Sequence, residues 1–219
     1  MAKHSQWSDE YWLLLMQLFL KKPAGAKALY SKELINLALE LHIKPQFLYE
    51  QMLRLRQLET PRMEQLWAKY SKNPKRLARN VSRLRKMKGF GQAQVFFDGV
   101  EVNESWEQDF RPLDITLPEG QTVTPVQLIM VLDLYFRLTP NTMVKETPEV
   151  KELGKKIGMS SDMVVDIMAI YQTCDPYLIR TVPVASPLVT PCKEIWERFG
   201  AENPEKLSAL AAQLHEYFK

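Results

Sequence analysis

The chain repeats itself, and this repeat constrains the fold more than any other feature. The segment SDEYWLLLMQLFLKK from Ser8 matches TPVQLIMVLDLYFRL from Thr124, and the sequences that follow match without a gap. After an insertion the match resumes, with QLWAKYSKNP corresponding to EIWERFGAENP. Long internal periods of this kind identify repeated structural units. We therefore expect two homologous domains joined by a linker, at residues 1–90, 123–219 and 91–122 respectively.

Each copy has the pattern of a helical domain, so the expected fold class is mostly α. Capping residues followed by proline mark several helix starts, as at Thr124-Pro125 and Asn73-Pro74. The pattern predicts four helices in the first copy, at 8–22, 31–41, 45–57 and 74–87, and a shorter helical turn at 62–70. It predicts four matching helices in the second copy, at 124–138, 147–157, 161–172 and 204–217, and a shorter helical turn at 192–199.

The linker has a different pattern from the two copies. The segment AQVFFDGVEVN at 93–103 alternates apolar and polar residues around Asp98-Gly99, which predicts a small β-hairpin. The segment RPLDITLPEGQ at 111–121 is rich in proline and is expected to be extended.

Residues 31–57 have the spacing of a helix-turn-helix unit, in which the second helix enters the DNA major groove. Five apolar residues would seal the two helices together: Leu37, Leu41, Leu48, Met52 and Leu55. Helical hairpins with this spacing also occur in proteins that bind no DNA. The same spacing leaves Gln46, Tyr49, Glu50, Gln51 and Arg54 off the sealed face, and the matching residues in the second copy are Asp162, Val165, Asp166, Ile167 and Ile170. Because glutamine and arginine can pair with base edges, we expect Gln46, Tyr49 and Arg54 to bind nucleic acid.

The stretch NPKRLARNVSRLRKMK at 73–88 is the most basic part of the chain. Residues 72–88 carry eight positive charges and no negative charge. Arginine and lysine recur every three or four residues, which places them along one side of a helix. We expect this side to contact phosphate through Lys72, Lys75, Arg76, Arg79, Arg83 and Lys86.

The second copy lacks these charges. Residues 202–218 contain Lys206 against three glutamates, a net charge of −2, and Ala209 and Gln213 stand where the first copy has Arg79 and Arg83. A helix of this fold therefore does not require a positive side. A solvated surface or an acidic protein partner remains the alternative explanation of the charges.

The overall charge balance follows the same division. Residues 1–92 carry a net charge of +11 and residues 93–219 carry −8, which gives +3 for the chain. Such asymmetry indicates that one half serves an anionic partner.

Two cysteines without a C-x-x-C motif favour a reducing cytoplasm. The apolar run YWLLLMQLFL is too short to span a bilayer and follows Asp9 and Glu10, which is wrong for a secretory signal.

Residues 124–213 resemble the helical domain that precedes the nuclease module in a class of prokaryotic HNH endonucleases. The resemblance is carried by Asp175-Pro176, Trp196 and Asn203-Pro204-Glu205, and residues 8–85 match more loosely. It implies a DNA-binding scaffold of restriction or defence type.

The nuclease module itself is missing from this sequence. HNH chemistry requires histidines around a metal, whereas His4, His42 and His215 are scattered. We therefore expect no catalytic residue, no metal site and no cofactor. The predicted function is non-enzymatic binding of nucleic acid, in particular double-stranded DNA, through the first copy. The second copy would support a homodimer or bind a protein partner. A protein-interaction adaptor and an accessory subunit of a nuclease system are the alternatives.

Overall fold

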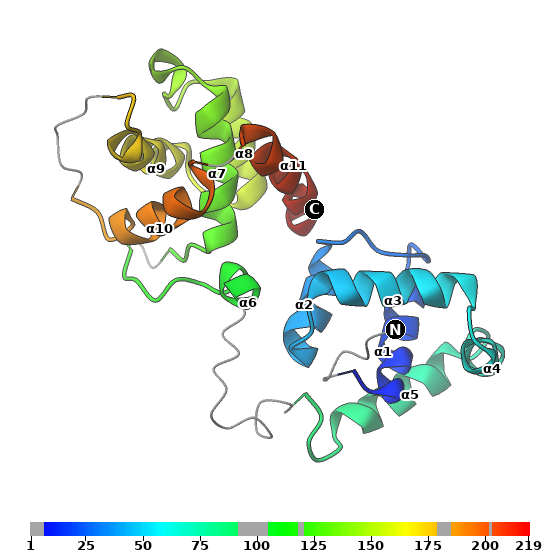
Figure 1. Ribbon diagram of the computed structural model, residues 1–219. Coiled ribbons are helices and arrows are strands. Elements are labelled where there is room, and N and C mark those ends of the chain that lie inside the picture. The colour runs from blue at the N-terminus through cyan, green and yellow to red at the C-terminus, as the bar shows by residue number, and fades with distance from the viewer. Residues whose placement is uncertain (1–6, 92–104, 118–120, 179–184, 202) are drawn as a thin grey trace. The chain divides into compact units, whose positions relative to one another are not determined.

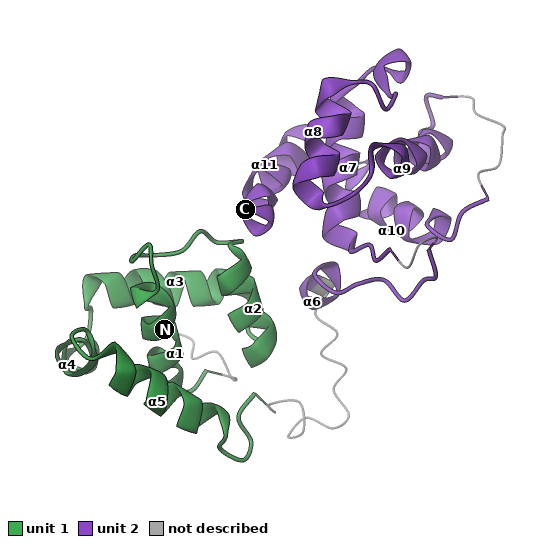
Figure 2. Ribbon diagram, turned by 180° about the vertical axis from the view of Figure 1, so that it is seen from behind, with its two compact units in different colours: residues 1–103 green, residues 104–219 purple. Residues whose placement is uncertain are grey.

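The computed structural model describes residues 7–91, 105–117, 121–178, 185–201 and 203–219, and these residues form helices and no strand. The protein is therefore mostly α, as predicted. It divides into two compact units, residues 1–103 (unit 1) and 104–219 (unit 2) (Figure 2). Within the described residues, no helix has the length and apolar character that crossing a bilayer requires.

Unit 1 is built around its first α-helix (Figure 1). A short 3-10 helix, η1, precedes α1, and α3 and α5 both pack on α1, while α2 packs on α3 and α4 packs on α5. The elements are η1 (Asp9–Tyr11), α1 (Trp12–Leu20), α2 (Lys32–Leu41), α3 (Pro45–Gln57), α4 (Pro61–Tyr70) and α5 (Pro74–Arg85).

Unit 2 is built around α7, which contacts α6, α8, α9, α10 and α11. Nearly every residue of α7 from Val126 to Tyr135 is buried, so this helix is the core of the unit. The elements are α6 (Ser105–Asp109), α7 (Pro125–Arg137), η4 (Pro140–Thr142), α8 (Pro148–Ile157), α9 (Ser161–Cys174), α10 (Val189–Phe199), α11 (Pro204–Leu214) and η5 (His215–Phe218).

Helices form at all ten predicted places, and their ends differ by a few residues. The predicted helix at 8–22 is η1 followed by α1 and ends at Leu20. It ends there because Lys21 has an extended backbone, with ψ 132°, so the next residues cannot continue the helix. The predicted helix at 204–217 is α11 followed by the 3-10 helix η5.

The helices of the two units correspond in position along the chain. Helices α2 and α8 begin 116 residues apart and also end 116 residues apart. Each is followed by a residue in the left-handed region, His42 (φ 54°) in unit 1 and Gly158 (φ 69°) in unit 2. In unit 1 the Ile43 N–H donates to the Ala38 carbonyl at 3.1 Å, and in unit 2 the Met159 N–H donates to the Gly154 carbonyl at 2.8 Å. This hydrogen bond closes a Schellman turn and fixes the angle between the two helices.

The predicted linker at 91–122 divides differently in the structure. The boundary between the units falls after Asn103, and the described residues 105–117 belong to unit 2. Helix α6 packs on α7, Asp109 accepts two hydrogen bonds from Arg198 of α10, at 2.7 and 2.8 Å, and Phe110 is buried. The predicted hairpin at 93–103 lies outside the described residues.

Candidate nucleic-acid interface

Helix α5 carries the predicted basic residues, and its buried side determines where they point. Asn73 is the N-cap and Pro74 the first helical residue, whose fixed φ suits that position. Leu77, Val81 and Leu84 recur at steps of four and three residues and are buried where α5 packs on α1. The opposite side of α5 therefore faces solvent.

Six basic side chains occupy the solvent side of α5 and its N-terminal approach. We call them the basic stripe: Lys72, Lys75, Arg76, Arg79, Arg83 and Lys86. All six residues are exposed. Among the described residues, none of the six forms an ion pair with a carboxylate. The structure thus brings these six predicted residues together as one positively charged surface, without an ion pair to any carboxylate in the described part of the chain.

Most of the other described arginines do have a carboxylate partner. Six of them form ion pairs, namely Arg54, Arg62, Arg85, Arg111, Arg137 and Arg198. Arg56 is the one described arginine outside the stripe without such a pair. None of the three arginines of the stripe is paired, although exposed arginines elsewhere in this protein find a carboxylate.

Arg85 holds the C-terminal end of α5 in place and is not part of the stripe. Its Nε and Nη2 atoms donate to the two carboxylate oxygens of Glu40 on α2, at 2.6 and 2.8 Å. The chain then turns back, so that Phe90 meets the ring of Tyr11 with centroids 6.0 Å apart. A side chain at Gly91 would lie 2.8 Å from the Glu40 carbonyl oxygen, so only glycine fits there.

The middle of α5 is held by α4. The side-chain amide of Asn80 donates to the Tyr70 hydroxyl at 2.7 Å. Trp67 of α4 packs edge-to-face on Phe19 of α1 at 5.8 Å. The middle and the C-terminal end of α5 are thus tied to the rest of unit 1, which gives the stripe a defined position.

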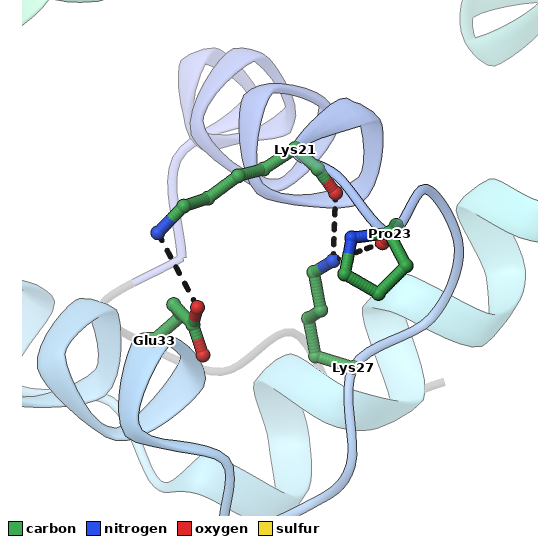
Figure 3. A network of polar contacts seen from close by, with 4 residues as sticks. All are labelled: Lys21, Pro23, Lys27 and Glu33. Carbon is green, nitrogen blue, oxygen red and sulfur yellow. Dashed lines mark hydrogen bonds and ion pairs between the residues drawn. The ribbon is translucent and has the colours of Figure 1, made fainter. Parts of the chain in front are cut away.

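The lysines between α1 and α2 have structural partners (Figure 3). The Lys27 ammonium donates to the carbonyl oxygens of Lys21 and Pro23, and so satisfies carbonyls at the end of α1. The Lys21 ammonium lies 3.3 Å from a carboxylate oxygen of Glu33 on α2. These contacts orient α2, which presents Glu40 to Arg85. The Lys21–Glu33 pair also lines a groove of about 510 Å³ between α1, α2 and α5.

The three predicted residues on α3 do not join the stripe. Gln46 is exposed and Tyr49 is half-buried. Arg54 is occupied, because its Nε donates to Glu59 at 2.7 Å and its Nη1 to Gln51 at 3.1 Å. Helices α3 and α5 lie on different sides of α1 (Figures 1 and 2), so their solvent faces point in different directions. A ligand lying along the stripe would therefore not reach Gln46 at the same time.

The prediction that Gln51 faces away from the core was wrong. Its side chain is buried, with 6% of its surface exposed, and it accepts the bond from Arg54. The matching residue of unit 2, Ile167, is fully buried, and so is Ile170 at the position that matches Arg54. Two isoleucines at these positions indicate the buried side of the helix, and this signal in the sequence could have corrected the assignment.

Helix α11 of unit 2 matches α5 in the sequence repeat and lacks its positive charges. Ala209 and Gln213, which match Arg79 and Arg83, are both exposed, and so is Glu205, which matches Lys75. The buried side of α11 is nevertheless equivalent, with Leu207, Ala211 and Leu214 in the core. The residues that build the helix thus correspond, while the residues that face solvent differ in charge.

No group of three or more His, Cys, Asp or Glu side chains among the described residues is placed to hold a metal ion. Burial raises the pKa of Cys192 to about 12, so this thiol stays protonated near neutral pH.

Comparisons with protein-family models, curated proteins and solved structures found no match for this chain.

Proposed function

We propose that the chain is a non-enzymatic, cytoplasmic DNA-binding protein of a restriction or regulatory system, and that the basic stripe contacts the phosphates of double-stranded DNA. The observation that carries the proposal is the set of six exposed cations without a carboxylate partner among the described residues. Like charges this close repel one another, and a polyanion offsets that repulsion. Contacts to phosphate position a protein on DNA without reading its sequence.

The two units are, in this proposal, copies of one scaffold that took different roles. The equal spacing of α2 and α8 and the left-handed residues His42 and Gly158 support a common origin. So does the equivalent aromatic packing, Phe19 on Trp67 at 5.8 Å and Tyr135 on Trp196 at 5.9 Å. The resemblance to the helical domain of HNH endonucleases belongs to the same proposal. Unit 2, without a positive stripe, would form a homodimer or bind a protein partner.

Salt dependence of binding tests the proposal directly. If all six cations neutralise phosphates of a duplex, log K should fall with log salt at a slope of about −5.4, which is six times −0.9. The double variant Arg79→Ala/Arg83→Ala should lower the magnitude of the slope by about 1.8. The measurement is a fluorescence anisotropy titration of the full chain with a labelled duplex at several salt concentrations.

A matched control removes the same charge from another place. Lys151 and Lys155 are exposed on α8, so Lys151→Ala/Lys155→Ala has the same net charge as the stripe variant. The control should keep the slope of the unchanged chain. If the magnitude of the slope falls by the same amount in both variants, net charge and not the stripe drives binding. If the unchanged chain binds no nucleic acid, the stripe has another partner, and an acidic protein becomes the leading candidate.

A further inference from the structure

We propose that a row of aromatic side chains at the C-terminal end of the stripe stacks on unpaired bases, so that the preferred ligand is duplex DNA with a single-stranded extension. The inference rests on the proposed function, because it names the kind of nucleic acid that the stripe would hold. The row consists of Phe90, Tyr11, Trp7 and Phe47.

The four rings form a continuous series. The ring centroids are 6.0 Å apart from Phe90 to Tyr11, 5.8 Å from Tyr11 to Trp7 and 5.6 Å from Trp7 to Phe47. Each of the four residues is partly exposed. Trp12, which is buried, supports the row at 5.0 Å from Trp7. A part of each ring thus stays at the surface, while its neighbours hold it edge-to-face.

The row begins where the stripe ends. Phe90 lies four residues after Lys86 and two after Lys88, both of which are exposed. The turn that brings Phe90 to Tyr11 is fixed by the Phe90 N–H, which donates to the Met87 carbonyl at 3.1 Å. Burial raises the pKa of Tyr11, Glu10 adds to the rise, and the Gly91 N–H bonded to the hydroxyl opposes it, so the ring stays neutral near pH 7.

Three residues of the row have a counterpart in unit 2, and none of these counterparts is aromatic. Trp7, Tyr11 and Phe47 are matched, 116 residues later, by Val123, Gln127 and Met163. Val123 is buried, and the Gln127 amide donates to the Ile157 carbonyl at 2.8 Å. A scaffold of this kind is thus built without aromatic rings at these places. As with the stripe, unit 1 has a surface that unit 2 lacks.

Cations beside exposed rings are the combination by which proteins hold unpaired nucleotides. The cations follow the phosphates, and the rings stack on successive bases without selecting a sequence. Bases inside a duplex are stacked on each other and offer no free face to a protein. The stripe alone would accept any duplex, whereas stripe and row together favour a duplex that continues as a single strand.

Three labelled ligands separate the contribution of bases from that of phosphates. They are a blunt duplex, the same duplex with a single-stranded extension, and the same duplex with an abasic extension, each extension tested on the 3′ and the 5′ strand. The abasic extension adds the same phosphates and no bases. We expect the full chain to bind the base-bearing extension at least about fivefold more tightly than the abasic one, the lower end of stacking on one base.

The variant Trp7→Val/Tyr11→Gln takes its replacements from the matching positions of unit 2. It should lose the preference for unpaired bases and keep the affinity for the blunt duplex. The single variant Phe90→Leu, in the turn after α5, should reduce the same preference and serves if the double variant does not fold. Circular dichroism and a thermal melt verify folding.

The results distinguish this inference from the proposed function. Equal binding of base-bearing and abasic extensions, or a preference that survives in the aromatic variants, overturns the stacking site while binding through the stripe stands. An aromatic variant that weakens all three ligands equally shows that the row only supports the fold. If Arg79→Ala/Arg83→Ala leaves binding to all three ligands unchanged, the proposed function itself fails.

Discussion

The repulsion within the stripe can be measured in the absence of any ligand. Arg79 lies within three or four residues of Lys75, Arg76 and Arg83, and the four side chains are exposed on one side of α5. Each like-charge pair at this spacing costs about 0.2 to 0.5 kcal/mol. Removing Arg79 relieves three pairs, so Arg79→Ala should stabilise the protein by about 0.6 to 1.5 kcal/mol at low salt.

The assay is thermal denaturation of the full chain followed by circular dichroism. A change of 1 kcal/mol in the free energy of unfolding moves Tm by about 4 to 8 °C in a domain of the size of unit 1, residues 1–103. Because salt screens exposed charges, the gain should shrink as salt is raised to about 1 M, where the screening length is about 3 Å. The same variant should bind DNA more weakly, so stability and binding move in opposite directions.

Arg85→Ala provides the matched control on the same helix. Arg85 is paired with Glu40 at 2.6 and 2.8 Å, so its removal should destabilise the protein by about 0.2 to 1 kcal/mol, the range of an exposed ion pair. Both substitutions replace arginine by alanine, but their effects on stability should have opposite signs. A destabilising Arg79→Ala at low salt would refute the reasoning, because it would mean that the folded protein already compensates that charge.

Three further changes test other parts of the structure. Leu77→Ala leaves a cavity under the stripe and should cost about 2 to 5 kcal/mol in urea denaturation, with Ala78→Gly as an exposed control. Gly158→Ala places a side chain at φ 69° and should lower stability by about 1 to 2 kcal/mol, although nothing lies within 4 Å of the added carbon. Burial lowers the pKa of His215, with Lys156, Arg137 and Lys219 adding to the effect and Asp133 opposing it. As the pH falls, the unfolded chain therefore takes up the proton on His215 before the folded chain does. The contribution of His215 to stability should be complete above about pH 6.5 and decrease as the pH drops below it. The variant His215→Gln should flatten this pH profile.

Local signals in the sequence were sufficient to place the helices. Proline after a capping residue marks the starts of α5, α7 and α11, and the spacing of apolar residues gives their buried sides. These signals act over a few residues, so they can be read without knowing the rest of the fold. The unpredicted helix α6 has five residues, too few to show a period, and it owes its position to packing on α7.

Contacts between distant residues could not be predicted in the same way. Arg85 and Glu40 are 45 residues apart, and nothing local distinguishes Arg85 from the arginines of the stripe. The aromatic row was missed for the same reason, since Phe90 meets Tyr11 only after α5 has crossed α1. Gln51 was misplaced because a polar residue was expected outside, whereas Arg54 supplies the hydrogen bond that allows its burial.

The arrangement of α5 explains how such a surface can exist without determining the fold. One side of the helix supplies Leu77, Val81 and Leu84 to the core, and Arg85 ties its end to α2, so folding uses none of the six cations of the stripe. Unit 2 has an equivalent buried side on α11 and, in place of Arg79 and Arg83, an alanine and a glutamine. If the cations were a requirement of folding, the corresponding helix of unit 2 would need them too. The proposed binding of a polyanion would offset their cost to stability, because it would remove the repulsion that Arg79→Ala is expected to relieve.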